Sequence, residues 1–376
     1  AGGGSLASVD SLGRIAVGPQ SAGSEPGPAC YGRGGTGATV TDADVAIGRI
    51  DPDDFAGGAI RLDAAAAETA LEASLGRALG LDAAHAALGV VEMVEETMAS
   101  AARVHAIEQG ADIGSRAMIA FGGAGPVHAL RMAAKLDIRR VLIPPRAGVG
   151  SAVGFLRAPV AYQVMRTQRM RLAELDEAAL AALLQDAEAE ARAIAGTATT
   201  EPLAATRMAY MRYEGQGHEI EVPLPDRLEA DGTLARRLAS LFRTAYAALY
   251  GRDVPEGRIE ALAWSVLVQA QGAAPPEPVS RPAAQAAQAV ATRRIVDPAS
   301  GAANDVPVYR RAALPAGGAF RGPALIVEEE TSVFVPAGWQ VGVAGDGVID
   351  CRMDPPETAA PRAVLREKRA REAQDT

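Results

Sequence analysis

The stretch at residues 118–130, MIAFGGAGPVHAL, constrains the fold of this chain more than any other part of the sequence. Apolar residues lead into a glycine turn, and the proline at position 126 predicts the start of a helix. Such a turn can bind an anion, because free backbone N–H groups and the positive end of the helix dipole face one point. A tight turn without a ligand explains the pattern equally well, since glycines also let a strand and a helix pack closely.

A second apolar strand is predicted at residues 140–143, after a helix over about 126–136. Strand, helix and strand within so short a stretch form a β–α–β unit, which implies a parallel sheet with a right-handed crossover. The second strand is followed by Gly148, Gly150 and Ser151. These residues are therefore expected at the sheet edge where α/β proteins form their ligand sites.

The composition argues against several classes of protein. The chain has 376 residues, which suggests two or three domains, and its net charge of −9 argues against a nucleic-acid partner. It has no run of the roughly 18 apolar residues that cross a membrane, and no signal-peptide pattern. Cys30 and Cys351 form no metal-binding spacing, and so few cysteines fit a cytoplasmic location. With only Lys135 and Lys368, Schiff-base chemistry and a P-loop lysine are not expected.

Three glycine clusters are candidate binding elements. A nucleotide site would explain them, because backbones must approach phosphates and sugars closely. However, His128 stands where a dinucleotide-binding turn needs a glycine, and no GK[ST] sequence is present. No histidine or cysteine spacing suits zinc, so no metal ligand is expected in the chain. The candidate binding residues are Gly2, Gly3, Gly4, Gly122, Gly123, Ala124, Gly125, Gly148, Gly150 and Ser151.

The N-terminal region combines a predicted hairpin with a long loop. Residues 6–9 and 14–17 are expected to form the two strands of the hairpin. The glycine-rich loop at residues 18–36 contains Glu25 and Cys30, and it favours a functional role over a plain surface loop because it gathers a carboxylate, a thiol and an arginine. Because the chain opens on alanine and a glycine run, we expect it to be a fragment of a longer polypeptide.

Three helices are predicted between this loop and the glycine turn. Thr41 is expected to cap a helix that begins near Asp42. A second, alanine-rich helix spans residues 63–80, and Asp82 is expected to cap a third helix over residues 83–109.

Two histidines lie within the predicted helices. His105 continues an apolar stripe along the helix at 83–109 and is expected to be a hydrogen-bonded core residue. His128 falls in the first turn of the helix that follows the glycines, where the helix dipole is expected to lower its pKa. A neutral His128 could then donate to a ligand, and local packing or capping explains the residue equally well.

After Pro159 the pattern changes to an α+β unit. Its predicted elements are a helix at 172–197, strands at 206–213 and 219–222, a helix at 234–249 and a strand at 259–270. The turn at 213–219 gathers polar side chains and favours an ordinary hairpin connection over a functional site. The Pro/Ala/Gln-rich residues 273–289 predict a linker, residues 290–354 a small β domain, and residues 355–376 a solvated, frayed helix.

Several segments together resemble one protein family. The sequence SAGSEPGPACYGRGGTGATVTDADVAIGRIDP at residues 21–52 closely resembles a signature of the hydantoinase A / 5-oxoprolinase family. Similar segments are AFGGAGPVHA at 120–129, IPPRAGVGSAVGFL at 143–156, MRYEGQGHEIEVPLP at 211–225, YGRDVPEGRIE at 250–260 and GPALIVEEETSVFVPAGW at 322–339. The resemblance therefore extends over nearly the whole chain.

The resemblance implies an α/β fold in which residues 1–160 form the adenosine-side half of an actin-like ATPase (ribonuclease H-like) domain. Residues 161–272 would follow as an α+β domain, before the linker and the small β domain. Use of ATP and Mg²⁺, a small cyclic amide or ketone as substrate, and a hydantoinase B-like partner subunit are implied as well. The family includes ATP-dependent cyclic-amide hydrolases and subunits of acetone and acetophenone carboxylases.

One departure from the family pattern affects the expected function. The two Asp-x-Gly-Gly-Thr phosphate motifs of the family are absent from the sequence, and most magnesium ligands are expected to be absent with them. We therefore expect only the adenosine half of the nucleotide site here, and no ATP turnover without a missing N-terminal half. The resemblance leaves Glu25 and His128 as candidate catalytic residues and the role of Cys30 open.

The favoured interpretation is the C-terminal part of an ATP-dependent enzyme that opens a cyclic amide. Two alternatives are a subunit of an acetone or acetophenone carboxylase-like complex and a non-catalytic interaction subunit. A relative of the sugar kinases would fit the implied fold but not the loop at residues 21–32.

Overall fold

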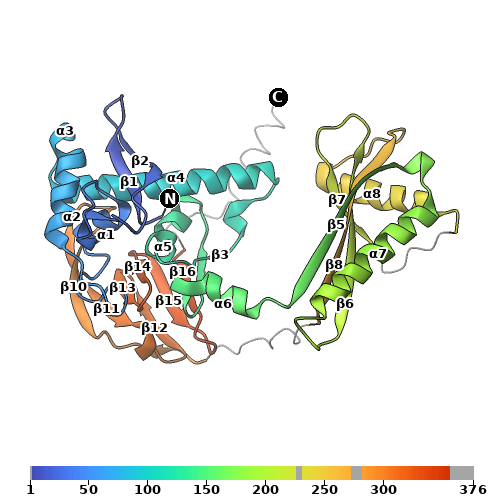
Figure 1. The fold of residues 1–376 in the computed structure, drawn as a ribbon. Helices are drawn as coiled ribbons and strands as arrows, with labels where there is room; N and C mark the ends of the chain where they lie inside the picture. The colour runs from blue at the N-terminus through green and yellow to red at the C-terminus, as the bar shows by residue number, and fades with distance from the viewer. Residues whose placement is uncertain (1, 226–230, 272–281, 356–376) are drawn as a thin grey trace, which may run out of the picture. The chain divides into compact units, whose positions relative to one another are not determined.

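The computed structural model describes residues 2–225, 231–271 and 282–355 (Figure 1). The chain divides into two units, of which unit 1 combines Ala1–Leu156 with Pro278–Thr376 and unit 2 is Arg157–Glu277. Residues 356–376 of the predicted frayed helix lie outside the described residues. Residues 273–281 of the predicted linker lie outside them as well.

Unit 1 begins with the predicted hairpin. Strands β1 (Ser5–Val9) and β2 (Ile15–Ser21) pair antiparallel, which confirms the hairpin prediction. The long loop that follows leads to helix α1 (Val40–Ala46). The prediction that Thr41 caps this helix was wrong, because the N-cap is Thr39, whose backbone is extended. The Thr39 side chain accepts from the backbone N–H of Asp42, and the Asp42 side chain accepts from the backbone N–H of Thr39.

The next helices form a layer beside α1. Helix α2 (Ala64–Leu71) continues through a π-helical segment, Glu72–Gly76, into the short α3 (Arg77–Leu79), where a single regular helix was predicted. Helix α4 (Ala83–Glu108) is capped by Asp82 as predicted. Apolar side chains of α1, α2 and α4 share one core with the hairpin.

The prediction that His105 is a core residue was wrong. The buried stripe of α4 ends at Ala99, and His105 is exposed. Its neighbour Ile107 is 73% exposed, because this last part of the helix extends beyond the packed layer. Helical periodicity alone does not show where a long helix leaves its core.

The predicted β–α–β unit is confirmed. Strand β3 (Met118–Ile119) pairs parallel with β4 (Arg140–Ile143), and helix α5 (Gly125–Lys135) connects them. A 3₁₀ turn at Ala147–Val149 and helix α6 (Gly150–Arg157) follow β4. The glycines of the turn at 122–125 thus lie between a strand and a helix, as expected.

The strands from the end of the chain complete this sheet. Strand β16 (Ile349–Met353) pairs antiparallel with β4, and the sheet has the order β3-β4-β16-β15-β12-β9. The added strands are β15 (Trp339–Val343), β12 (Gly318–Arg321) and β9 (Gln285–Ala286). Strands predicted as a separate small β domain therefore share a sheet with the β–α–β unit, and β9 falls inside the predicted linker.

A second sheet of unit 1 has the order β10-β11-β13-β14. Its strands are β10 (Ala291–Val296), β11 (Ala303–Arg310), β13 (Ala324–Val327) and β14 (Ser332–Val335). Apolar residues of α5, β4, β13, β14 and β15 form one continuous core, with Leu130, Ile143, Ile326 and Trp339 among its buried members.

Unit 2 is an α+β unit, as predicted. Its sheet has the order β5-β8-β6-β7 and all neighbours are antiparallel. The elements are β5 (Ala161–Arg171), α7 (Glu177–Ala195), β6 (Leu203–Tyr213), β7 (Ile220–Leu224), α8 (Leu234–Tyr250) and β8 (Ile259–Ala270). Helix α7 begins later than predicted, because Asp176 caps it after a 3₁₀ turn at Leu172–Glu174.

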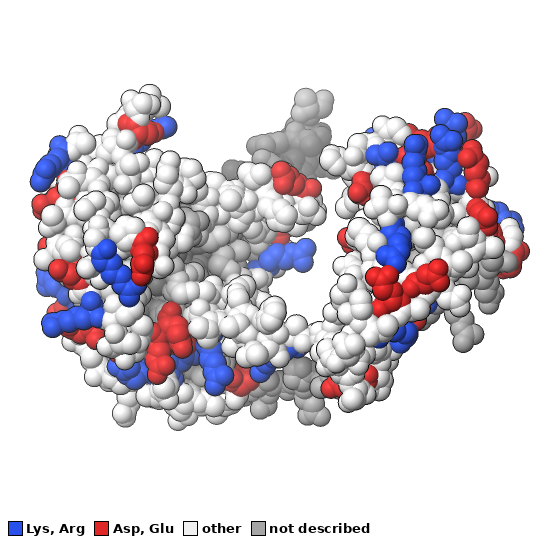
Figure 2. Space-filling view, viewed as in Figure 1, with Lys and Arg blue, Asp and Glu red and all other residues white. Residues whose placement is uncertain are grey.

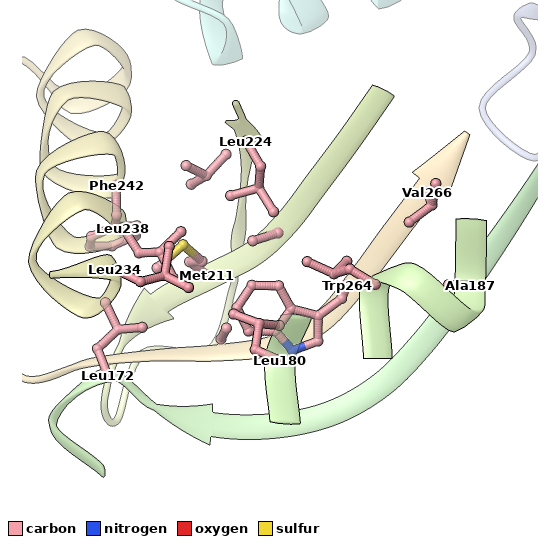
Figure 3. Close-up of a cluster of buried hydrophobic side chains, with 14 of the residues drawn as sticks. Leu172, Leu180, Ala187, Met211, Leu224, Leu234, Leu238, Phe242, Trp264 and Val266 are labelled. Atoms are coloured by element: carbon pink, nitrogen blue, oxygen red, sulfur yellow. The ribbon is translucent and has the colours of Figure 1, made fainter. Parts of the chain in front are cut away.

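The core of unit 2 is built around Trp264 (Figure 3). Leu180 and Ala187 of α7 and Leu238 and Phe242 of α8 are buried in the same cluster. The indole Nε1 of Trp264 donates to the carbonyl oxygen of Gln168 at 3.1 Å, so the single polar atom of this large side chain is satisfied.

Charged side chains of both signs are interspersed over the face of the protein shown in Figure 2. In the described part of the chain, every helix is too short or too polar to cross a membrane. The charge distribution and the helix lengths do not locate a functional site. A cavity in unit 1 is the candidate for that site.

Candidate functional site

A cavity of about 240 Å³ lies in unit 1 beside the glycine turn. Six segments form its wall, and they come from both ends of the unit. The lining residues are Gly3, Gly4, Tyr31, Thr41, Asp44, Ile50, Asp51, Asp54, Phe55, Ala56, Gly123, Ala124, Val127, Val327, Glu328, Glu329, Glu330, Thr331 and Ser332.

The cavity brings together two of the three predicted glycine clusters. Gly3, Gly4, Gly123 and Ala124 line it. A side chain at Gly3 would run into the Thr41 hydroxyl, so the backbone here comes close to α1 because the residue is glycine. Ala124 lies beside Gly3, since a side chain at Gly3 would come within 3.9 Å of the Cβ of Ala124.

The remaining candidate glycines have structural positions around the cavity. Gly122 has φ +96°, a conformation that favours glycine, and its N–H donates to the Ala147 carbonyl at 2.7 Å. A side chain at Gly148 would press on the backbone of Glu330, and one at Gly150 would touch Phe121. Several predicted site residues are not among the described residues that line the cavity. They are Gly2, Gly122, Gly125, Gly148, Gly150, Ser151 and Glu25.

Glu25 and Cys30 differ strongly in exposure. Glu25 is exposed on the loop. Cys30 is fully buried, and burial together with the nearby Asp42 carboxylate raises the pKa of its thiol. A thiol held in its protonated form is a poor nucleophile, so Cys30 serves the packing of the loop. Burial likewise raises the pKa of Cys351 to about 12.

Helix α5 begins at the cavity wall with Gly125 and has Pro126 in its first turn. The N-cap residue, Ala124, has no side-chain acceptor, so no side chain caps the first N–H groups of the helix. His128 follows in the same turn, with its side chain turned into a buried cluster of charges.

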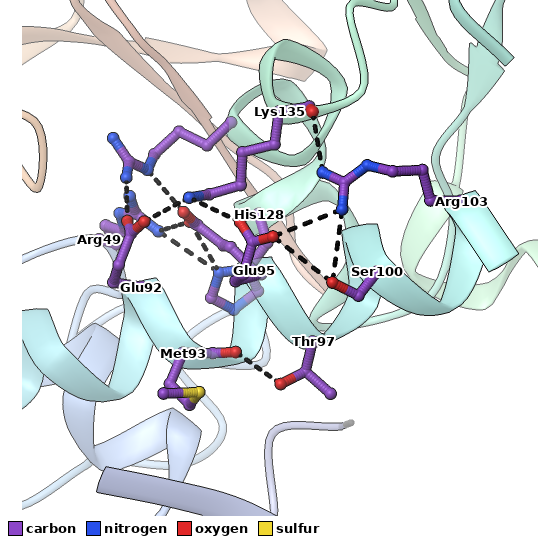
Figure 4. A network of polar contacts seen from close by, with 11 residues as sticks. Arg49, Glu92, Met93, Glu95, Thr97, Ser100, Arg103, His128 and Lys135 are labelled. Atoms are coloured by element: carbon purple, nitrogen blue, oxygen red, sulfur yellow. Dashed lines mark hydrogen bonds and ion pairs between the residues drawn. The ribbon is translucent and has the colours of Figure 1, made fainter. Parts of the chain in front are cut away.

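The charged cluster joins α1, α4 and α5 (Figure 4). His128 is 3% exposed, and its Nε2 lies 3.2 Å from Oδ2 of Asp44 while its Nδ1 lies 3.4 Å from Oε1 of Glu95. Arg49 Nη1 lies 3.1 Å from the same Glu95 oxygen. The guanidinium of Arg49 also stacks 4.6 Å from the ring centre of Phe334 on β14.

The carboxylates decide the protonation of His128. Burial by itself lowers the pKa of His128, but Asp44 and Glu95 outweigh it and raise that pKa to about 9. The predicted lowering by the helix dipole was therefore wrong, because two carboxylates within 3.4 Å act more strongly than the dipole. His128 therefore carries its second ring proton at neutral pH.

Glu95 is the centre of the cluster. Burial raises its pKa, yet His128, Arg49 and Arg131 together lower that pKa to about 2. Arg131 donates to Glu95 at 2.6 Å and to Glu92 at 2.7 Å, which extends the network to the surface of α4. The signal for this residue was available, because a glutamate one turn after Val91 interrupts the apolar stripe of α4.

Asp44 connects the charged cluster to the cavity. It is 1% exposed, lines the cavity and has Arg49 Nη1 at 3.8 Å from Oδ1, too far for a hydrogen bond. Within the described residues, Asp44 Oδ1 and His128 Nε2 have no hydrogen-bond partner. A buried carboxylate oxygen without a hydrogen-bond donor is costly, and the positive charge of Arg49 at 3.8 Å offsets part of that cost.

Three other carboxylates of the wall are paired with arginines from the second sheet or from the 3₁₀ turn Arg311–Ala313 that follows β11. Asp51 pairs with Arg293, and Asp54 accepts from Arg310 at 2.8 Å. Glu328 accepts from Arg311 at 2.7 Å, and burial nevertheless raises the pKa of Glu328. These pairs tie the loop at 50–56 and the turn after β13 to neighbouring strands.

The exposed Glu329 and Glu330 add further negative charge at the cavity rim. Such a rim suits uncharged or positively charged groups better than a polyphosphate. Within the part of the chain that the structure describes, no group of three or more His, Cys, Asp or Glu side chains is placed to hold a metal ion.

A glycine turn between a parallel strand and a helix borders the cavity and gives unit 1 an α/β fold with a candidate ligand site. The family model for hydantoinase/oxoprolinase matches residues 1–164, and the model for the hydantoinase/oxoprolinase C-terminal domain matches residues 166–350. The chain therefore belongs to the hydantoinase/oxoprolinase family, as the sequence motifs indicated.

Relatives of known name support the same assignment. The chain is 34% identical to the caprolactamase subunit alpha of Pseudomonas jessenii over 351 residues, which cover 91% of this chain and 50% of that protein. It is 25% identical to the acetone carboxylase beta subunit of Xanthobacter autotrophicus, over 94% of this chain and 51% of that subunit. The chain thus spans about half the length of each of these two relatives.

The fold is also that of a solved relative. The crystal structure of the ATP-dependent caprolactamase from Pseudomonas jessenii matches with a TM-score of 0.75 and 32% identity, over 94% of this chain and 52% of that chain. This likeness confirms the α/β fold class.

Proposed function

We propose that this chain is part of an ATP-dependent enzyme that opens a small cyclic amide. Its relatives named caprolactamase and 5-oxoprolinase support this reaction class. The observation that carries the proposal is its 34% identity over 91% of its length to a caprolactamase subunit. The cavity supports it, because a glycine-lined wall next to an uncapped helix start suits a small ligand with a polar edge.

ATP, when bound, would supply the phosphoryl group that activates the amide carbonyl. We assign the adenosine side of its site to this chain, where the backbone at Gly123 and Ala124 leaves room for close approach. The acidic rim at Glu329 and Glu330 does not suit a polyphosphate, and the described residues offer no magnesium site. Phosphate and Mg²⁺ binding are therefore proposed to come from residues outside this sequence.

The catalytic candidates have different proposed roles. His128 lies 3.2 Å from Asp44 and its pKa is raised to about 9, so we propose a positioning role for it and not that of a general base. Glu25 is exposed on its loop, and a role for it would need a substrate or a partner segment to cover that loop. A hydantoinase B-like subunit is the proposed partner, since the named relatives are subunits of larger enzymes.

A second candidate function is carboxylation of a ketone. It is favoured by the likeness to the acetone carboxylase beta subunit over 94% of this chain. A carboxylase would need bicarbonate or carbon dioxide as a second substrate, and that requirement separates the two functions in an assay.

The test uses a complex of this chain with a segment that carries the Asp-x-Gly-Gly-Thr motifs and with a hydantoinase B-like subunit. Product formation is measured by mass spectrometry from ε-caprolactam, 5-oxoproline, hydantoin and acetone, with and without ATP and bicarbonate. We expect ring-opened product from one cyclic amide only when ATP is present. Carboxylated acetone and no ring opening would reject the hydrolase proposal and support the carboxylase.

A further inference from the structure

Three turns of unit 1 pack against one another. They are the glycine turn at 122–125 after β3, the 3₁₀ turn Ala147–Val149 after β4 and the turn at 328–331 between β13 and β14. The first two are joined by the hydrogen bond from the Gly122 N–H to the Ala147 carbonyl at 2.7 Å. The last two lie in close contact, because a side chain at Gly148 would run into Glu330.

The side chain of Thr331 completes this set of contacts. Its hydroxyl Oγ1 donates to the carbonyl oxygen of Gly123 at 2.8 Å, and the residue is buried. Among the described residues, no other side chain hydrogen-bonds the backbone of the glycine turn. Each of the three turns is therefore in contact with the other two.

The turn that carries Thr331 is tied to the sheet. The N–H of Glu328 donates to the Thr331 carbonyl at 2.9 Å, which closes the turn. Arg311 donates to the Glu328 carboxylate at 2.7 Å and to the carbonyl of Ile143, at the end of β4, at 2.9 Å. Thr331 therefore bonds the glycine turn from a backbone whose own position is held.

The bond to Gly123 orients a whole peptide unit. The peptide between Gly123 and Ala124 is trans and planar, so its carbonyl oxygen and its N–H point in opposite directions. With the oxygen held by Thr331, the N–H of Ala124 is directed away from Thr331. Both residues line the cavity, and glycine has the backbone freedom to turn this unit over.

We propose that Thr331 is a positioning residue, whose hydroxyl holds the Gly123–Ala124 peptide in the orientation that the glycine turn presents to a ligand. Without the hydroxyl, the Gly123 carbonyl loses its partner and the turn adopts other orientations for part of the time. A ligand then binds more weakly, because only a fraction of the molecules has a competent site. The inference rests on the proposed function only in its second test, where ATP is the ligand.

Three variants separate the hydroxyl from the rest of the side chain. Thr331→Val removes the hydroxyl and keeps the branched shape, whereas Thr331→Ser keeps the hydroxyl. The matched control is Thr97→Val on α4, where a threonine hydroxyl donates to the Met93 carbonyl at the same 2.8 Å (Figure 4). The control loses the same kind of bond at a place away from the three turns.

The first test is hydrogen exchange of the full chain, resolved to single amides by mass spectrometry. The N–H of Gly122 reports on the turn, and the N–H of Ala120, bonded to the Leu142 carbonyl at 2.9 Å, is the internal reference. We expect Thr331→Val to speed exchange at Gly122 at least about fivefold and to leave Ala120 unchanged, because the turn opens more often.

Thr331→Ser and Thr97→Val should leave the exchange at Gly122 within about twofold of the unmodified chain. Unchanged exchange in Thr331→Val would overturn the inference. Equal acceleration in Thr331→Ser would overturn it too, because the hydroxyl would then not be the cause.

The second test is the steady-state kinetics of the assembled complex. Thr331→Val is expected to raise the KM for ATP about fivefold with kcat within about twofold, and Thr331→Ser is expected to keep both values. A merely structural loss would instead lower the amount of active enzyme, and hence kcat, with KM unchanged. An unchanged KM in an active complex would also overturn the inference.

These results are separable from the proposed function. Hydrogen exchange needs no turnover, whereas the proposed function is tested by ring opening. Where the complex opens no ring with ATP, the proposed function is rejected, and the exchange at Gly122 alone decides for or against Thr331. ATP-dependent ring opening with unchanged exchange would reject the role of Thr331 alone.

Discussion

At the scale of single residues, the protonation of His128 is set by side chains from distant parts of the chain. Its position in the first turn of a helix could be predicted from the sequence. Asp44 and Glu95 lie on α1 and α4, and nothing in the local sequence around His128 shows that they meet it. The helix dipole alone does not decide this pKa, because the carboxylates that face the ring come from other helices.

The first prediction concerns the influence of Asp44 on His128. Apart from burial, which acts in the opposite direction, Asp44 is the main cause of the raised pKa of about 9. In Asp44→Asn the pKa of His128 should therefore fall by about one unit or more. A titration of the histidine ring followed by NMR measures this shift. An unchanged pKa would show that Asp44 does not interact with His128 in solution.

The second prediction is a pH dependence of stability. The pKa of His128 rises from 6.5 to about 9 on folding, so its stabilising contribution is complete below about pH 6.5 and is lost as the pH rises through 9. The pKa of Glu95 falls from 4.5 to about 2, so its contribution is complete above about pH 4.5 and is lost as the pH falls towards 2.

Urea denaturation between pH 6 and pH 9.5 should show the alkaline loss. We expect the free energy of unfolding to fall by up to about 3 kcal/mol over this range. A His128→Gln variant starts less stable but should lack this decline. The same decline in the variant and in the unmodified chain would assign the titration to another group.

At the scale of elements, the glycine turn combines one strained position with one open position. Gly122 has φ +96°, whereas a side chain at Gly125 would meet open space. Gly122→Ala should therefore cost about 1–2 kcal/mol of stability, and Gly125→Ala should change it by less than about 1 kcal/mol. Thermal unfolding of the two variants makes the comparison. Equal losses would contradict the backbone conformation described for this turn.

Local signals predicted the elements well. The β–α–β unit, the Asp82 cap of α4 and, with the exception of β5, the strands and helices of unit 2 were predicted because their patterns are confined to adjacent residues. The pairing of β16 with β4 was not predicted, since strand pairing between distant segments leaves no local pattern. The hydrogen-bond cap at Thr39 was missed because Thr41 offered the same chemistry near the same place.

At the scale of the whole molecule, the family could be recognised from motifs, whereas the cavity required the fold. Its wall combines residues 3–4, the loop at 50–56, the turn at 123–127 and the turn at 327–332. Two of these segments could be predicted as binding elements because glycines mark them. The acidic turn at 328–330 could not, because a run of glutamates also fits a solvated surface.

The chain divides into two units and spans about half the length of the named relatives. Unit 1 carries the cavity, the charged cluster and the uncapped helix start. We propose that residues outside this sequence supply the phosphate-binding motifs. ATP use and ring opening are therefore proposed to be coupled in a complex to which this chain contributes the adenosine side.

The most direct measurement of this coupling is the ratio of ADP formed to rings opened by that complex. We predict one ADP for each ring-opened product, and neither product from this chain alone under the same conditions. Ring opening without ATP, or ATP hydrolysis by the isolated chain at the rate of the complex, would contradict the proposed coupling.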